Sequence, residues 1–457
     1  MLTFDIKEVI DNDYCIGCGT CVAIAPETFE AYLDFKTGQI KAKYKTQSNH
    51  QDWANADQVC PFSSASLNED EIADIYKYDG IKYNERIGHY QSIYVSRVSD
   101  SSIYKKASSG GIIRWLLQKL LNEGKVSSVI CVIPGEGRSL FKYAILNSVD
   151  DIINSATSSY YPVEWSEILS IIEKTDKPIA ITGLPCFIKA LKNYIRAKGL
   201  NPSLFITVGL ICGHLKSTFY AFMLAEQLNI RPSDLRSINF RKKMPNTLAN
   251  NKGVAVRSTL DTSKEEVVTT VKQLFGTDYG FGLFKYKACD FCDDVFAETA
   301  DVVVGDAWIP KYLNQGNSLL VTRSNLVDAL IKKYTQKGEL ITDRITIDEA
   351  IASQDAGLRH RKDTISYRLY LEKKKKKWVP LKRSYSHNHF SIRTKLIQRL
   401  RILAREKSTE YYYHNLQAPN FRRFKAKVNY LFGIYKSLYG KVWLRPLKLL
   451  LALLNLY

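Results

Sequence analysis

The chain has 457 residues, of which 45% are hydrophobic, so it exceeds one ordinary core and is expected to be globular with two or three folding units. Its net charge of +19 is concentrated at one end: residues 357–457 carry 25 Lys and Arg against 4 Asp and Glu, whereas the rest carries 40 against 42. The acidic N-terminal residues contain no long apolar run, which argues against a secretory signal and predicts a cytoplasmic protein. Because the cytoplasm keeps thiols reduced, the nine cysteines are expected to be metal ligands or redox groups rather than disulfides.

The first motif is YCIGCGTCVAIAPE, in which Cys15, Cys18 and Cys21 have iron–sulfur spacing. A two-cluster ferredoxin has a fourth cysteine after three intervening residues, before a proline, but this chain has Ala25 there. Because that fourth cysteine serves the other cluster, a domain with one cluster can lack it. The three thiolates therefore require a distant fourth ligand.

Cys60, also followed by a proline, supplies that ligand after a stretch predicted to form a hairpin. Gly17 and Gly19 allow the loop to wrap closely and to turn backbone N–H groups toward an anionic cluster. The four cysteines predict a [4Fe–4S] cluster, with a structural zinc site or a decayed motif as the alternatives.

Between about residues 90 and 325, β-branched apolar runs alternate with helical segments, which predicts an α/β unit with buried strands. The runs are VSSVICVIPG (126–135), KPIAITGLPC (177–186), SLFITVGLICGH (203–214) and ADVVVGDAW (300–308).

Further cysteines follow these runs. Cys186 and Cys212 come at predicted strand ends, where ligands of open α/β sheets gather, and Cys289 and Cys292 form a C-x2-C pair ahead of the last strand. They are predicted to bind a second cluster. A zinc knuckle, a dithiol and small apolar core residues remain alternatives, and Cys131, inside an apolar run, is interpreted as core packing.

The segment KKASSGGIIRWLLQKLLNEGK (105–125) predicts a helix that follows a Ser-Ser-Gly-Gly turn. Unpaired N–H groups at its start suit a phosphate, although Ser108 or Ser109 as a simple N-cap is an equal alternative. Its apolar positions at helical spacing are Ile112, Trp115, Leu116 and Leu120.

These residues carry a resemblance. The series ASSGG, SSYYPV, GLPC, GLICGH and CDFCDDVFAETADVVVGDAW resembles the family of beta subunits of coenzyme F420-reducing hydrogenase and dehydrogenase, which is similar to the plant hydroxymethyl-chlorophyll reductase. The resemblance covers roughly residues 10–325. It implies an oxidoreductase that contains FAD and two 4Fe-4S clusters.

The same resemblance assigns flavin-binding positions and a loop that presents Cys186. Cofactor-binding residues by this motif match are Ser108, Ser109, Gly110, Gly111, Ser158, Tyr160, Gly183 and Pro185.

The resemblance does not name the substrate. It implies a redox partner that is a ferredoxin, a reduced deazaflavin or a nicotinamide, and a setting in surface-polysaccharide biosynthesis. Residues 239–253 depart from the glycine- and tryptophan-rich form expected there, which leaves the hydride donor open.

His214 is interpreted as a structural histidine rather than a proton donor or cluster ligand, and no catalytic side chain is assigned. The alternative functions are a non-catalytic scaffold and a pure electron-transfer subunit.

Past residue 357 the catalytic motifs stop. Lys373 to Lys377 predict a solvated linker, and residues 390–407 predict a basic amphipathic helix with Ile392, Leu396, Leu400 and Leu403 on one face. The last apolar stretch, nine residues after Lys448, is too short to span a bilayer. The tail is expected at an anionic membrane surface, at the inner face of the cell membrane, with packing on the core or on a neighbouring copy in a homo-oligomer as the alternative; no motif supports nucleic-acid binding.

The fold class predicted from these patterns is an α/β core with a small N-terminal ferredoxin-like α+β domain and a basic, largely helical C-terminal tail. The expected domains are a 4Fe-4S domain over 1–75, a flavin and iron–sulfur domain over 76–350, and the tail over 351–457.

Overall fold

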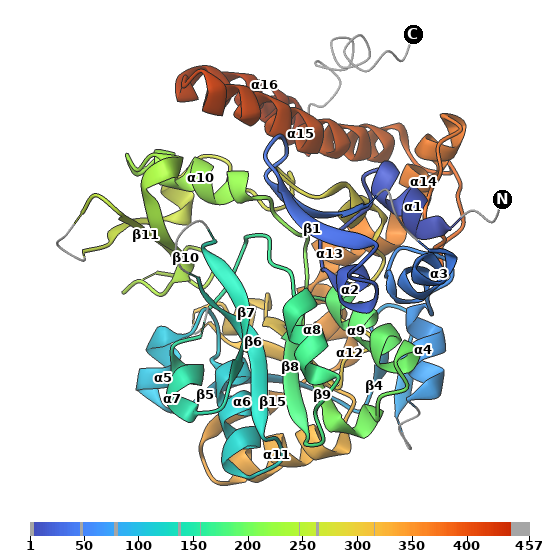
Figure 1. The fold of residues 1–457 in the computed structure, drawn as a ribbon. Coiled ribbons are helices and arrows are strands. Elements are labelled where there is room, and N and C mark those ends of the chain that lie inside the picture. The colour runs from blue at the N-terminus through green and yellow to red at the C-terminus, as the bar shows by residue number, and fades with distance from the viewer. Residues whose placement is uncertain are drawn as a thin grey trace.

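A computed structural model describes residues 4–45, 49–76, 81–135, 139–155, 157–245, 247–261, 265–314 and 316–439. At its centre lies a mixed eight-stranded sheet with helices on both faces. A small N-terminal α+β domain and a helical C-terminal region lie above this core in Figure 1. The predicted fold class, an α/β core between an α+β start and a helical end, is confirmed.

The N-terminal domain consists of short helices around a two-stranded antiparallel hairpin, which is the hairpin predicted between the third and fourth cysteines. Side-chain caps begin its last two helices. Asn49 accepts a hydrogen bond from the Asp52 N–H, and Asn68 forms a capping box with Glu71. The elements are α1 (Asp5–Asp11), α2 (Thr20–Ile24), β1 (Phe29–Asp34), β2 (Gln39–Tyr44), α3 (His50–Val59) and α4 (Glu69–Ile75).

The large sheet has the strand order β15 (Leu340–Arg344), β5 (Ser92–Val98), β14 (Ser318–Thr322), β13 (Val302–Asp306), β9 (Phe205–Leu210), β8 (Ile179–Gly183), β6 (Ser128–Pro134) and β7 (Phe141–Leu146). The four central strands, β13, β9, β8 and β6, are parallel, and the flanking strands pair antiparallel. These four are the strands predicted from the apolar runs. Because they are parallel, their carboxyl ends open at the same edge of the sheet.

Two helices cover each face of the sheet: α6 (Ile112–Asn122) and α11 (Asn325–Gln336) on one, and α8 (Ser166–Ile172) and α9 (Pro185–Ala197) on the other. On the first face, Leu116 of α6 joins Val304 and Leu330 in one buried cluster. On the second, Leu191 of α9 joins Ile181 in another cluster, which extends into the N-terminal domain. Apolar burial on both faces is what holds the central strands in place.

Smaller elements surround this core. A hairpin, β3 (Lys82–Asn84) and β4 (Gly88–Tyr90), and a three-stranded antiparallel sheet, β10 (Leu235–Lys242), β11 (Gly253–Ser258) and β12 (Val267–Thr270), lie outside the large sheet. The short helices are α5 (Ser101–Lys106), α7 (Val149–Ile153) and α10 (Thr218–Glu226), and 3-10 turns are η1 (Pro202–Leu204), η2 (Pro232–Asp234), η3 (Val271–Gln273), η4 (Lys287–Phe291) and η5 (Pro310–Tyr312).

The C-terminal region is largely helical. Its two long helices lie side by side along the top of Figure 1, over α10 and the N-terminal hairpin. The predicted lysine run is exposed at the end of α14. The elements are α12 (Ile347–Ser353), α13 (Asp355–Leu358), the π-helical turn η6 (Arg359–Asp363), α14 (Ile365–Lys374), α15 (Ile392–Gln417) and α16 (Phe421–Ser437).

The helix predicted over residues 390–407 is the first half of α15, but its apolar face is not free. Leu396 and Leu400 are only 2% and 1% exposed and belong to the same buried cluster as Phe284, whereas Ile392 is 63% exposed. This face packs against the core, which was the alternative to membrane binding for this segment. The reason is that a large apolar surface of the core lies beside it.

The expected membrane-binding end lies outside the described residues, which stop at 439. None of the helices in the described ranges combines the length and the hydropathy that a transmembrane span requires.

The packing of α15 predicts that Leu400→Ala lowers the free energy of unfolding by about 2–5 kcal/mol, because it leaves a cavity in a filled core. Ile392→Ala, on the same helix but exposed, is the matched control and should change stability by less than about 0.5 kcal/mol. Urea unfolding of both variants measures the difference. Equal midpoints would contradict the packing of this face.

Candidate functional site

Cys15, Cys18 and Cys21 lie on the loop and first turn leading into α2, and Cys60 ends α3. All four are free thiols. Burial raises the pKa of Cys21, and Cys15, Cys18 and Cys60 raise it further, so the four sulfurs are close enough to interact electrostatically. The fold therefore brings the first predicted ligand set together.

Hydrogen-bond donors face these sulfurs. The Cys15 sulfur accepts from the N–H of Gly17 at 3.4 Å and from the N–H of Ala42, on the hairpin, at 3.2 Å, and the Thr20 hydroxyl donates to the Cys18 sulfur at 3.4 Å. Gly17 has a φ of +67°, and a Cβ there would lie 2.1 Å from the Ile40 carbonyl oxygen. Only glycine fits this close wrap, which directs N–H groups at sulfur as an anionic cluster requires.

The second set comes from three separate segments. Cys212 lies two residues beyond β9, Cys289 lies in η4 and Cys292 follows that turn. Cys186 lies in the first turn of α9 rather than in a loop, because Pro185 is suited to begin a helix. Burial raises the pKa of Cys186, and Cys292, Cys212 and Cys289 raise it further. These four free thiols also converge.

The two sets are neighbours. Cys18 also raises the pKa of Cys186, and burial, Cys186 and Cys18 all raise that of Tyr143. Trp165 joins the N-terminal domain to the core, because its backbone N–H donates to the Cys18 carbonyl at 3.1 Å and its indole donates to the Thr20 hydroxyl at 3.0 Å. The two cysteine sets thus border one continuous buried apolar cluster.

Among the described residues, no three His, Cys, Asp or Glu side chains are close enough together to hold a single metal ion. A cubane cluster binds each of its four thiolates to a different iron, so the ligands of a cluster lie farther apart than those of one ion. Cys131, interpreted as core packing, lies in β6 with 5% exposure inside an apolar cluster.

A cavity of about 860 Å³ opens at the carboxyl edge of the sheet and reaches the second cysteine set through Cys212. Gly110 and Pro185 are not among its lining residues: Gly110 packs on β5 and β14, where a Cβ would lie 2.4 Å from the Ser96 carbonyl oxygen. The flavin positions from the resemblance that do line it are Ser108, Ser109, Gly111, Ser158, Tyr160 and Gly183.

The start of α6 lies in the cavity wall. Its N-cap is Gly111, with a φ of 84° and no side-chain cap, so neither Ser108 nor Ser109 is the N-cap. The Ser109 hydroxyl instead donates to the Asn317 carbonyl at 2.9 Å. Of the two alternatives for this turn, the side-chain cap is wrong, and the first N–H groups of the helix have no such partner.

Cationic side chains from the segment that departs from the family pattern line the same cavity. Arg241 forms an ion pair with Asp306 at 2.6 Å. Lys252 is 5% exposed, and within the described residues its amine has no hydrogen-bond partner but forms an ion pair with Asp306 at 3.8 Å. Burial and Arg241 lower the pKa of Lys252 to about 8. Its position in the cavity cannot be deduced from sequence spacing.

His214 and Lys216 lie farther along the cavity wall. The His214 ring stacks on Tyr279 at a centroid distance of 4.0 Å, its Nε2 has no hydrogen-bond partner in the described part of the chain, and burial holds its pKa well below the usual value. Lys216 donates to the Leu283 carbonyl at 2.6 Å, and burial and then Lys285 lower its pKa to about 7. Both are buried polar groups facing a ligand-sized space.

The C-terminal region contributes to this site as well, which the sequence did not indicate. His360, Arg361 and Arg401 line the cavity. Burial lowers the pKa of Arg361, but Cys292, Cys212 and Cys289 raise it, and the net shift is upward. The candidate site therefore extends beyond residue 357. No local sequence motif identifies these residues. Arg361, for example, hydrogen-bonds to Cys212 and Cys292, which are distant in the sequence.

The separate ligand sets predict that Cys60→Ser removes one cluster and leaves the other. Anaerobically purified protein should then hold about four irons instead of about eight, because each four-cysteine set suits one [4Fe–4S] cluster. Iron analysis and electron paramagnetic resonance of the reduced protein measure this. Cys131→Ser is the matched control and should keep both clusters; an unchanged pair of signals in Cys60→Ser would exclude Cys60 as a ligand.

Comparison with known protein families and curated proteins gives concordant matches. Residues 10–66 match the 4Fe-4S single cluster domain of ferredoxin I. Two models of one family, the coenzyme F420 hydrogenase/dehydrogenase beta subunit, match the core: the N-terminal model at residues 93–170 and the C-terminal model at residues 176–348.

Relatives are 22–23% identical to this chain. An uncharacterised protein of Methanocaldococcus jannaschii is 22% identical over 76% of this chain and 93% of its own length. A component of the F420H2 dehydrogenase of Methanosarcina mazei is 22% identical over 52% of this chain and 64% of its own length. The coenzyme F420-dependent sulfite reductase of M. jannaschii is 23% identical over 77% of this chain, which spans 49% of that enzyme.

The two family models together span more than half of the chain, in the order and at the positions of the strands and cysteines described above. The chain belongs to the family of coenzyme F420 hydrogenase/dehydrogenase beta subunits.

Proposed function

We propose that this protein is an iron–sulfur flavoprotein oxidoreductase that exchanges a hydride with a soluble redox partner and passes electrons between FAD and two [4Fe–4S] clusters. The observation that carries the proposal is one cavity whose wall includes both the start of α6 and Cys212 of the second cysteine set. A cofactor held there lies beside a cluster ligand, and that ligand set adjoins the first.

The residues present fit FAD. The cavity, at about 860 Å³, is at the upper end of the range for cofactor pockets. The free N–H groups at the start of α6 and the Lys252 amine, which has no hydrogen-bond partner among the described residues, would hold its phosphates. Tyr160 and Tyr279 supply aromatic wall. When bound, FAD supplies the exchange between two-electron hydride chemistry and one-electron transfer.

The protein's own contribution is burial and orientation. The carboxyl edge of the sheet holds the cavity, and the four central strands fix the segments that carry Cys186 and Cys212. Tyr143 and Trp165 belong to the same buried apolar cluster as cysteines of both sets, and this cluster excludes water. No side chain is assigned as a proton donor, since the flavin performs the hydride chemistry itself.

The redox partner is proposed to be anionic. Arg241, Lys252, Lys216 and Arg401 all line the cavity, and a deazaflavin or nicotinamide coenzyme carries phosphate groups that such cations attract. The names of two relatives include coenzyme F420, which favours a reduced deazaflavin for this chain over a ferredoxin. The setting in surface-polysaccharide synthesis and the cytoplasmic membrane-surface location stay predictions.

Composition of the purified protein tests the proposal. Anaerobic preparation should give about eight irons, a matching amount of acid-labile sulfide and one FAD per chain, because each of two four-cysteine sets suits a four-iron cluster. Eight irons without flavin would refute the flavoprotein proposal and support the scaffold or pure electron-transfer alternative. An iron content of about four per chain would refute the second cluster.

The cavity wall predicts that Lys252→Gln weakens FAD binding by about tenfold or more, because a charge-assisted hydrogen bond to phosphate is worth roughly 1.5–3 kcal/mol. Lys242→Gln is the matched control: it lies on β10 nearby but forms an ion pair with Glu266 and does not line the cavity. Flavin retention and equilibrium titration of the deflavinated proteins measure the difference. Equal affinities would place the phosphates elsewhere.

A further inference from the structure

Arg361, in the π-helical turn η6, has its guanidinium buried beside the second cysteine set. It is 2% exposed. One nitrogen donates to the Cys292 sulfur and, at 2.6 Å, to the Asp294 carbonyl; the others donate to the carbonyls of Cys292 at 2.9 Å, Cys212 at 3.0 Å and Gly213 at 2.8 Å. A single side chain thus ties together two of the three segments that supply these cysteines.

Within the described residues Arg361 forms no ion pair: all its hydrogen bonds go to backbone carbonyls and one sulfur. The Asp294 carboxyl also favours the charged guanidinium, but less than Cys292, Cys212 and Cys289 do, and burial raises its own pKa to about 7. Burying an unpaired cation is costly, so buried charges normally have a counterion. The anions that its position matches are the thiolates of the neighbouring cysteines. The residue also lies beyond position 348, where the family match ends.

We propose that Arg361 sets the reduction potential of the second cluster, raising it by placing a positive charge and a hydrogen bond at the Cys292 sulfur. This inference rests on the proposed second cluster. Reduction adds one negative charge to an already anionic group, and a fixed cation beside it stabilises the reduced form more than the oxidised form. In a buried site this attraction is weakly screened, whereas backbone N–H donors supply only partial charge.

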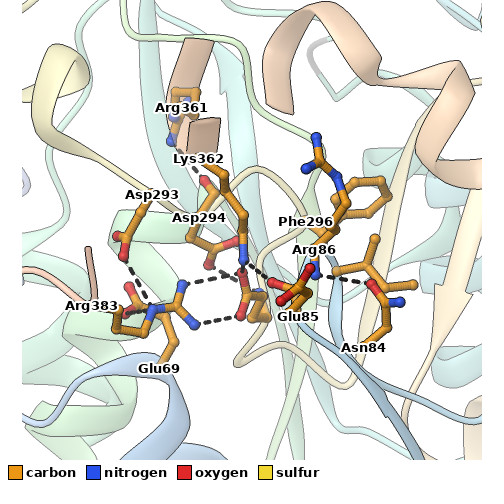
Figure 2. Close-up of polar contacts among 12 residues, drawn as sticks. Glu69, Asn84, Glu85, Arg86, Asp293, Asp294, Phe296, Arg361, Lys362 and Arg383 are labelled. Atoms are coloured by element: carbon orange, nitrogen blue, oxygen red, sulfur yellow. Dashed lines mark hydrogen bonds and ion pairs between the residues drawn. The ribbon is translucent and has the colours of Figure 1, made fainter. Parts of the chain in front are cut away.

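The surroundings hold Arg361 in this position. The next residue, Lys362, forms an ion pair with Glu298 at 2.8 Å, and Arg383 binds both Glu298 at 2.7 Å and Asp293 at 3.1 Å (Figure 2). These pairs fix η6 against the segment that directly follows Cys292. Figure 2 shows Arg361 at the edge of this network, next to Asp294. Isolated π-helical turns of this kind often occur at functional sites.

The two ligand sets differ in this respect. The Cys15 and Cys18 sulfurs accept hydrogen bonds from backbone N–H groups and one hydroxyl, and no described arginine or lysine donates to any sulfur of that set. The first cluster is therefore the internal reference, because Arg361 donates a hydrogen bond to none of its sulfurs.

The test is a redox titration of full-length holoprotein, monitored by electron paramagnetic resonance, with wild type, Arg361→Gln and Arg361→Lys. The signal that remains in Cys60→Ser identifies the second cluster. Arg361→Gln should lower its one-electron reduction constant by at least about tenfold, about 59 mV toward more negative potential. Arg361→Lys, which keeps the charge, should shift it less, and the first cluster should not move.

Arg368→Gln is the matched control. Arg368 is equally buried and lies in α14, but its partners are the carbonyls of Asp290 and His360, Thr364 and the Gln398 side chain, and none is a cysteine. Its substitution should leave both potentials unchanged. Equal shifts in Arg361→Gln and Arg368→Gln would show a general effect of core disruption and overturn the proposal.

Iron content separates the remaining outcomes. An eight-iron Arg361 variant with an unmoved second potential refutes the role of Arg361 and leaves the proposed function intact. A wild-type protein with only four irons refutes the second cluster itself. If Arg361→Gln loses four irons, the reduction potential of the second cluster is measured in Arg361→Lys instead. Loss of the cluster from both variants overturns the proposal in favour of a role in cluster assembly.

Discussion

The constraint on which the rest of this structure depends is the burial of two sets of thiols, which we propose bind iron as thiolates. Burial is the largest influence on the pKa of Cys18, Cys21, Cys186 and Cys289, and in each case it raises the pKa. The negative charge that a cluster carries must therefore be balanced inside the protein. The first set is supplied with N–H and O–H donors from its own domain. The second has the Leu215 N–H at the Cys289 sulfur and, in addition, the guanidinium of Arg361 at the Cys292 sulfur.

The C-terminal region packs against both the N-terminal domain and the second cysteine set. The network around Arg383 joins Glu69 of α4, Asp293 behind Cys292 and Glu298, so that the N-terminal domain, the cysteine loop and the C-terminal region are locked to one another. Above it, α15 covers apolar core with Leu396 and Leu400. A segment whose composition resembles a solvated basic tail is, over its described part, a structural wall of the redox site.

The sequence predicts those parts of the site that depend on local pattern. Cysteine spacing predicts two ligand sets, and the fold brings the cysteines of each set near one another. The β-branched runs predict the four central strands, which the structure has. Arg361 and Lys252 cannot be predicted in this way. The hydrogen-bond partners of Arg361 lie 67 to 149 residues away in the sequence, and Asp306, the partner of Lys252, lies at the end of β13. A basic residue in a basic segment carries no local sign of burial.

The helix start at Gly111 shows the same limit on a smaller scale. The pattern identifies the turn and the helix, but the identity of the cap depends on what Ser109 contacts, and its hydroxyl is drawn to the Asn317 carbonyl beside β14. Gly110 is likewise required by the close approach of β5 and not by a ligand. The local sequence thus predicts the turn and the start of α6. Which group pairs with the first N–H groups of that helix depends on the surrounding fold.

The charges of the cavity follow from the same balance. Burial lowers the pKa of Lys252 to about 8 and that of Lys216 to about 7, so both amines sit near the point where they lose their protons at neutral pH. An anionic ligand beside them favours the charged form and raises both pKa values. A phosphate in the cavity would therefore strengthen the positive charge of Lys216 above all, because Lys252, with a pKa of about 8, is already mostly protonated at neutral pH.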